Sequence, residues 1–107
     1  MEVRYQVTEE GLWIQMPREL DHHVAAVLCG RIDGLVEEYR VRELYLDFSE
    51  TEFMDSSGIG MLIGRSRTMG FRKGKVSALG MSSRVRRLFD AAGLGQLIAV
   101  KEELDGE

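Results

Sequence analysis

The sequence predicts an α/β domain with a mixed, mostly parallel β-sheet and helices packed on one face. Short runs of alternating apolar residues, typical of strands, are separated by longer runs with apolar residues at helical spacing. After an initial pair of strands the two kinds of run alternate, in the order β-β-α-β-α-β-α-β, which favours right-handed crossovers between parallel strands. Three helices are too few to cover both faces of a sheet, so we expect them on one face.

The first two runs predict a hairpin. Residues 3–8 alternate Val3, Tyr5 and Val7 with polar residues, which is typical of a half-buried strand. A second apolar run, residues 12–16, ends at Pro17, which cannot continue a paired strand.

The next segment, residues 22–40, predicts an amphipathic helix. Its apolar residues recur near helical spacing, and Asp21 stands where an N-cap carboxylate would accept a backbone N–H bond. The apolar positions are Val24, Val27, Leu28, Ile32, Leu35 and Tyr39.

The second half of the chain continues the alternation. Residues 43–48 predict a strand with Leu44, Leu46 and Phe48 on one face, and a second helix begins near Ser57 and runs toward Met69. Residues 75–80 predict a short buried strand.

A third helix and a last strand complete the predicted fold. Ser82 or Ser83 caps this helix, and its apolar positions are Val85, Leu88, Phe89 and Ala92. Gly93 is expected as the left-handed residue after the helix, with Leu94 making the apolar contact of a Schellman motif. Residues 96–100 form the final strand.

Composition limits the class of protein. The 107 residues suit one domain, residues 1–107, and 44% hydrophobic with 30% charged residues is usual for a folded globule. The net charge of −4 argues against general nucleic-acid binding, which depends on neutralising phosphates. We therefore interpret Arg84, Arg86 and Arg87 as the solvated face of the third helix. The lone Cys29 suits a reducing compartment.

We expect a cytoplasmic protein without a membrane partner. The first ten residues hold no apolar core of signal-peptide length, and no run approaches the ~18 apolar residues that would span a bilayer.

The segment "FMDSSGIG", residues 53–60, is the candidate functional site. One cap residue suffices to start a helix, yet three residues of capping type stand in a row. Gly58, Gly60 and Gly64 then leave the first turns of the helix without side chains, although each interior glycine costs about 1 kcal/mol relative to alanine. Such a helix start is a surface that another protein's backbone can approach closely.

Three kinds of chemistry are conceivable for this segment. A serine hydrolase would use Ser56 with His22 or His23, but the Gly-x-Ser-x-Gly elbow is absent. No lysine follows the glycines as a phosphate-binding loop requires, so no nucleotide cofactor is expected. Asp21, His22 and His23 are consecutive and point in different directions on a helix, which favours capping and surface roles over a metal site.

Three segments together resemble the anti-sigma factor antagonists, which are bacterial STAS-domain proteins, and in particular those of the sporulation sigma-F pathway. The segments are "DFSETEFMDSSGIGMLIGR" (47–65), "RELDHH" (18–23) and "VRRLFDAAGLGQLI" (85–98). They occur in the family's order, and the resemblance extends over nearly the whole chain.

The resemblance implies a non-enzymatic regulator of transcription. In the family, the unphosphorylated antagonist binds an anti-sigma factor that is also a serine kinase, and the sigma factor is released. The kinase, which itself binds ATP or ADP, then phosphorylates the serine after the motif aspartate, and a serine phosphatase removes the phosphate. In this chain that serine is Ser56. The implied partner-binding residues are Asp21, Asp55, Ser57, Gly58, Ile59 and Gly60.

The chain departs from the family in two places. Arg18 stands where the family usually has glycine, and "KEELDGE", residues 101–107, allows only a turn or two of the family's final helix. Two alternatives stay open. One is a STAS module that serves another bacterial signalling assembly through the same phosphoserine, and the other is a small serine hydrolase.

Overall fold

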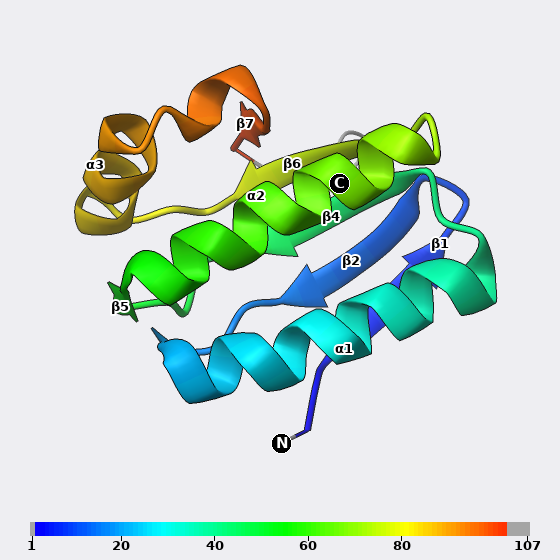
Figure 1. Ribbon diagram of the computed structural model, residues 1–107, viewed down its shortest axis with the longest axis horizontal. Helices are drawn as coiled ribbons and strands as arrows, with labels where there is room; N and C mark the ends of the chain where they lie inside the picture. Colours follow the sequence, from blue (N-terminus) through cyan, green and yellow to red (C-terminus); the bar gives the residue numbers. More distant parts are fainter. Residues whose placement is uncertain (1, 103–107) are drawn as a thin grey trace.

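The computed structural model describes residues 2–102 and contains two β-sheets and three α-helices (Figure 1). The main sheet has five strands in the order β1-β2-β4-β6-β7, and a small second sheet pairs β3 with β5. The strands are β1 (Tyr5–Thr8), β2 (Gly11–Gln15), β3 (Glu19–Leu20), β4 (Glu43–Asp47), β5 (Phe53–Met54), β6 (Lys75–Leu79) and β7 (Ala99–Lys101). The helices are α1 (His22–Tyr39), α2 (Ser56–Phe71) and α3 (Ser83–Ala91), with a short 3₁₀ helix, η1 (Leu94–Gln96).

The main sheet is mixed and mostly parallel, as the sequence predicts. Among the described strands, only β1 and β2 pair antiparallel, as a hairpin. The pairs β2–β4, β4–β6 and β6–β7 are all parallel. Each parallel pair is joined through a helix, so the carboxyl ends of the parallel strands lie at one edge of the sheet.

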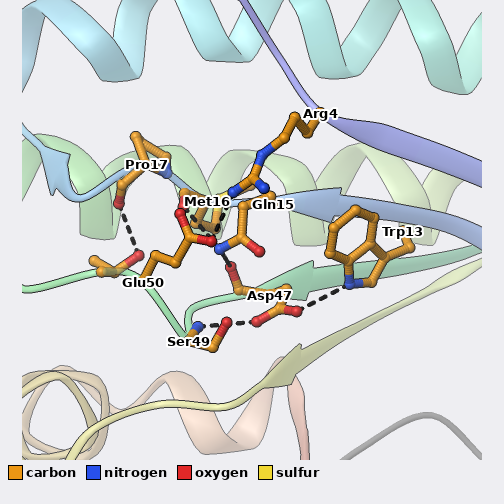
Figure 2. A network of polar contacts seen from close by, with 9 residues as sticks. Arg4, Trp13, Gln15, Met16, Pro17, Asp47, Ser49 and Glu50 are labelled. Carbon is orange, nitrogen blue, oxygen red and sulfur yellow. Dashed lines mark hydrogen bonds and ion pairs between the residues drawn. The ribbon is translucent and has the colours of Figure 1, made fainter.

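The helices cover one face of the main sheet, which confirms the predicted architecture (Figure 1). Because strand side chains alternate between faces, Ile14 and Leu46 point to the helices while Trp13 and Asp47 point to the other face. On that other face, Trp13 Nε1 donates a 3.1 Å hydrogen bond to Asp47 Oδ2 (Figure 2). The core between sheet and helices includes Leu28 and Leu62, both fully buried.

Several predicted apolar positions are not in the core. Val27, Tyr39 and Leu88 are exposed, and so is Ala92. The buried residues of α1 are Ala25, Leu28, Ile32, Leu35 and Val36. Because successive helix residues are rotated by about 100°, Val27 lies on another side of the helix. Helical spacing alone does not distinguish these exposed apolar residues from the buried ones.

The first strand is also more exposed than predicted. All four residues of β1 are exposed, because β1 is the edge strand of the sheet and lies beyond the cover of the helices. A hydrogen bond between Tyr5 and Tyr39, assisted by the neighbouring Glu38, raises the pKa of Tyr39 to about 12.

The last predicted strand begins three residues late. The sequence predicts a strand over residues 96–100, but η1 occupies the first of these positions and β7 begins at Ala99. Gly93 is left-handed as predicted, with φ of 74°, and Leu94 is fully buried. The amides of Leu97 and Ile98 both donate to Leu94 O at 2.9 Å, so the chain completes a further helical turn before the strand starts.

The starts of α2 and α3 lie where the capping residues predict them. Ser82 is the residue that caps α3, and α2 begins at Ser56, next to Ser57, as predicted. The family's final helix would fall mainly on residues 103–107, which lie outside the described residues. Within residues 2–102, the helices are too short or too polar to cross a bilayer.

Candidate functional site

The small β3–β5 sheet, which the sequence did not predict, brings two helix starts together. It pairs Glu19 with Phe53 and Leu20 with Met54 in parallel. The next residue on each strand is an aspartate, and each aspartate is the N-cap of a helix: Asp21 for α1 and Asp55 for α2. The predicted phosphoacceptor region and the "LDHH" segment are therefore neighbours, although more than 30 residues separate them in the sequence.

A set of polar contacts holds the loop that leads into β5 (Figure 2). Thr51 is buried, and its Oγ1 donates to Pro17 O at 2.8 Å. On the preceding strand, Asp47 accepts from Gln15 Nε2 through its carbonyl at 3.1 Å and from the Ser49 amide through Oδ1 at 2.9 Å. These bonds tie residues 47–51 to the end of β2 and so fix the entry to the site.

Arg18, where the family usually has glycine, contributes mainly through its backbone. Its carbonyl accepts from the amides of Glu52 and Phe53, at 2.8 and 3.1 Å. Its side chain forms an exposed ion pair with Glu52, a kind of contact that adds little stability. The φ angle of Arg18 is not positive, so the backbone here does not require glycine. The departure from the family therefore leaves the local fold intact.

The two aspartates satisfy the first free N–H groups of their helices. Asp55 Oδ1 accepts from the amides of Ser57 and Gly58, at 2.8 and 3.3 Å. Asp21 Oδ1 accepts from the Val24 amide at 3.0 Å. A carboxylate in this position also interacts favourably with the helix dipole. Both side chains thus start helices and still place two negative charges at one end of the molecule.

The two serines that follow Asp55 have different surroundings. Ser56 is exposed, and within residues 2–102 its hydroxyl makes no hydrogen bond. Ser57 is half-buried, and its Oγ lies 3.3 Å from Nδ1 of His22 on α1. The hydroxyl of Ser56 is therefore free, whereas that of Ser57 bridges the two helices.

A groove of about 330 Å³ runs between α1 and α2 from this bridge. Small side chains line much of it, and it is closed at the far end by Arg65, whose side chain is only 12% exposed. Arg65 Nε lies 3.1 Å from Asp33 Oδ1, an ion pair that joins the two helices. The lining residues are His22, Ala25, Ala26, Cys29, Ser57, Gly60, Met61 and Arg65.

Gly58 and Gly60 differ in burial and in the space that a side chain would have. Gly58 is buried, and a Cβ atom there would stand 2.6 Å from Met54 Cγ and 3.1 Å from Leu20 O. A Cβ at Gly60 would meet nothing within 4 Å. Gly58 therefore lets α2 pack closely on the β3–β5 sheet, and its part in partner binding stays a prediction. Gly60 is exposed and leaves open space.

The predicted partner-binding residues thus divide into two groups. Gly60 is exposed and Asp21, Asp55 and Ser57 are half-buried near Ser56, whereas the equally half-buried Ile59 packs against the core and Gly58 is buried. Neither the contact of His22 with Ser57 nor the pair of Arg65 with Asp33 was predicted from the sequence. The pair of Arg65 with Asp33 could have been predicted, because the two residues carry opposite charges on helices that a parallel fold places side by side.

The arrangement gives little support to the other chemistries. The histidine contacts Ser57 rather than Ser56, and the carboxylates of Asp21 and Asp55 accept bonds from backbone amides. Across the described residues, no three His, Cys, Asp or Glu side chains gather in a way that could hold a metal ion.

The sequence and the fold of this chain have counterparts among known proteins. The STAS domain model matches residues 2–106. This chain belongs to the STAS domain family. The predicted resemblance is therefore confirmed.

Relatives of this STAS domain carry regulatory names. The anti-sigma F factor antagonist of Lysinibacillus sphaericus is 33% identical over 89 residues, which cover 83% of this chain and 76% of that protein. The anti-sigma-B factor antagonist of Listeria monocytogenes is 32% identical over 101 residues, covering 84% of this chain and 87% of that protein.

Solved structures agree with the fold of this STAS domain. The phosphorylated form of the Bacillus cell fate determinant SpoIIAA superposes with a TM-score of 0.74 at 30% identity, covering 95% of this chain and 93% of SpoIIAA. The unphosphorylated anti-sigma factor antagonist SpoIIAA gives a TM-score of 0.76 at 26% identity, covering 97% and 91%. These matches support the single α/β STAS domain that the sequence predicts.

Proposed function

We propose that this STAS domain is an anti-sigma factor antagonist controlled by phosphorylation of Ser56. Its unphosphorylated form binds an anti-sigma factor that is also a serine kinase, and this binding releases the sigma factor. The proposal is supported by the names of relatives that are 32–33% identical over more than four fifths of the chain. It is also supported by a likeness to SpoIIAA, which has been solved in phosphorylated and unphosphorylated forms.

The free hydroxyl of Ser56 is the observation that carries the choice of acceptor. Ser56 is the first residue of α2, exposed, and without a hydrogen bond to any described residue. A kinase can therefore reach its Oγ without breaking a contact of the fold. The Ser57 hydroxyl, in contrast, is half-buried and held near His22.

The phosphoryl transfer requires few groups from this chain. The bond between the γ-phosphorus of ATP and the bridging oxygen of ADP breaks, and a bond forms between that phosphorus and Oγ of Ser56, whose proton passes to a base of the kinase. ATP and its metal ion are held by the kinase, so the STAS domain supplies an acceptor and a docking surface. A serine phosphatase hydrolyses the phosphoserine and restores the binding form.

The electrostatics of the site explain how the phosphate ends binding. A phosphoserine adds about −1.5 to −2 charges at neutral pH. The amides of Ser57 and Gly58 are already bonded to Asp55, so the phosphate projects from the surface beside the carboxylates of Asp21 and Asp55. A partner that docks here would have to desolvate three neighbouring anionic groups, whereas the helix start itself tolerates negative charge. Binding is lost while the fold is kept.

The experiment is a titration with a candidate anti-sigma kinase. The unphosphorylated domain and the fully phosphorylated domain are each titrated into the kinase in the presence of ADP, and release of the bound sigma factor is followed in the same series. We expect tight binding and sigma release from the unphosphorylated form alone. If both forms bind equally, the phosphoserine switch is wrong. Phosphorylation on Ser56 by a kinase that binds no sigma factor would instead favour a STAS module of another signalling assembly.

A further inference from the structure

Five basic residues gather at the end of the molecule opposite Ser56. The helix α2 begins at Ser56 and spans 16 residues, which is about 24 Å at 1.5 Å per residue. At its far end, the connections that leave α1 and α2 run side by side, because the Lys75 amide donates to Arg42 O at 2.8 Å. These connections carry Arg40, Arg42, Arg72, Lys73 and Lys75, and we call this surface the basic end.

The basic end is hollowed. A cleft of about 370 Å³ is lined by Glu37, Arg40, Val41, Arg42 and Arg72. Arg72 is neutralised there, because its Nη1 lies 2.8 Å from Glu37 Oε2. Arg40 and Arg42 are exposed, and neither forms an ion pair with any other residue in the range 2–102. The cleft therefore presents two free guanidinium groups.

Two cations of the basic end occupy backbone conformations that favour glycine. Arg40 has φ of 51° and Lys73 has φ of 60°, and within residues 2–102 they are the only residues other than glycine with positive φ. Such a conformation is unfavourable for a residue with a Cβ atom. The nearby helix C-termini attract positive charge and offset part of this cost. That attraction does not account for Arg42, which directly precedes β4, or for Lys75, the first residue of β6.

An exposed aromatic side chain stands beside these cations. Phe71, the last residue of α2, is 89% exposed, more than any other large apolar residue described. It directly precedes Arg72, which lines the cleft. A single exposed apolar residue is unremarkable on its own, but this one adjoins in sequence a residue that lines the cleft with the two free guanidinium groups.

We propose that the basic end binds an acidic segment of a partner protein that also carries an apolar side chain. Carboxylates of the segment pair with Arg40 and Arg42, whose forked donors match carboxylate geometry, and the apolar side chain packs on Phe71. A concave cleft admits a peptide chain more readily than a flat bilayer. The net charge of −4 weakens long-range attraction to any anionic partner, so binding here depends on close contacts inside the cleft.

This second surface lies at the far end of α2 from Ser56, so it does not depend on the proposed switch. An acidic segment and a partner at Ser56 can be bound at the same time. The Ser56→Asp variant should accordingly bind the acidic segment as the parent does.

The experiment uses a fluorescein-labelled ten-residue peptide with six glutamates around a central leucine, followed by fluorescence anisotropy at low salt. The double variant Arg40→Glu/Arg42→Glu should weaken binding at least tenfold, and Phe71→Ser should weaken it several-fold. Arg87→Glu is the matched control: it reverses an exposed charge on α3 and should change affinity less than twofold. An amide NMR titration should place the shifts on residues 40–43 and 71–75.

Other outcomes would contradict the proposal. Equal losses from Arg87→Glu and the double variant would mean that only overall charge matters. Shifts centred on Ser56 would place the binding elsewhere. Vesicles containing phosphatidylglycerol that bind the parent, while the peptide does not, would replace the acidic segment with a membrane surface. Circular dichroism of each variant should match that of the parent, since the substituted side chains are exposed.

Discussion

Ser56 and Ser57 are adjacent in sequence but differ in what holds their hydroxyl groups. Ser56 is exposed and free, while Ser57 lies 3.3 Å from His22 Nδ1. The difference arises from the helix: successive residues are rotated by about 100°, so one serine points outward when the other faces α1. The choice between them that the family resemblance implies therefore has a local physical basis.

This difference predicts which serine is phosphorylated. With a cognate kinase and ATP, Ser57→Ala should still take up one phosphate on Ser56, because the free hydroxyl is unchanged. Ser56→Ala should take up none. Mass spectrometry of the proteolysed product measures both. Phosphate found on Ser57 in the parent, or uptake by Ser56→Ala, would show that the acceptor is wrongly assigned.

Gly58 and Gly60 provide a matched pair for the fold and the docking surface. Gly58→Ala should destabilise the domain by about 1–3 kcal/mol, because the new methyl group meets Met54 and the Leu20 carbonyl in a packed site. Gly60→Ala should stabilise it by roughly 0.5–1 kcal/mol, since the helix gains an alanine in open space. Thermal unfolding distinguishes the two.

The same pair separates packing from binding. Gly60→Ala should weaken association with the anti-sigma kinase despite its higher melting temperature, because the methyl group enters the groove beside Ser57. Parent-like affinity for Gly60→Ala would remove this glycine from the docking surface.

The β3–β5 sheet organises the site through its pairing. Only two residues long on each side, it sets Asp21 and Asp55 next to one another and fixes the angle at which α1 and α2 begin. Both caps also carry the charge that the phosphate would meet. A change at either aspartate can therefore act on helix stability and on docking.

A comparison of two substitutions at Asp55 separates these effects. Asp55→Ala should cost about 1 kcal/mol, because the amides of Ser57 and Gly58 lose their acceptor. That corresponds to a fall of about 4–8 °C in melting temperature for a domain of this size. Asp55→Asn keeps an acceptor and should melt near the parent. Equal losses for both variants would mean that the charge, rather than the hydrogen bonds, stabilises the helix start.

The main elements were predictable because their patterns are long. The helices over residues 22–40 and after Asp55, and the strands over 43–48 and 75–80, each repeat an apolar pattern often enough to be recognised. The β3–β5 sheet was missed because two-residue strands show no alternation. The last strand was placed early because Leu97 and Ile98 look like strand residues, whereas their amides close a turn on Leu94.

The candidate site was predictable in part. The motif around Ser56 identified the helix start and its aspartate cap, since capping residues have a local signature. The role of Gly58 could not be inferred, because its close neighbours Met54 and Leu20 depend on how α2 packs against the small sheet. The contact of His22 with Ser57 likewise depends on the distance between two helices, which no local pattern encodes.

The whole molecule separates its functions by position. The sheet and the faces of α1 and α2 that cover it form the core, while Ser56 lies at one end and the basic end at the other. Because Ser56 makes no contact that the core needs, a charge added there should change the surface alone. This separation is the central claim, and it applies to the domain as a whole rather than to any single contact.

The most direct test combines a binding isotherm with an amide NMR spectrum for Ser56→Asp and Ser56→Ala. Ser56→Asp should bind the anti-sigma kinase at least tenfold more weakly than the parent, a loss of about 1.4 kcal/mol, while its spectrum changes only near residues 20–23 and 54–60. Ser56→Ala should bind within about twofold of the parent. Parent-like affinity of Ser56→Asp, or shifts spread across the main sheet, would contradict the account.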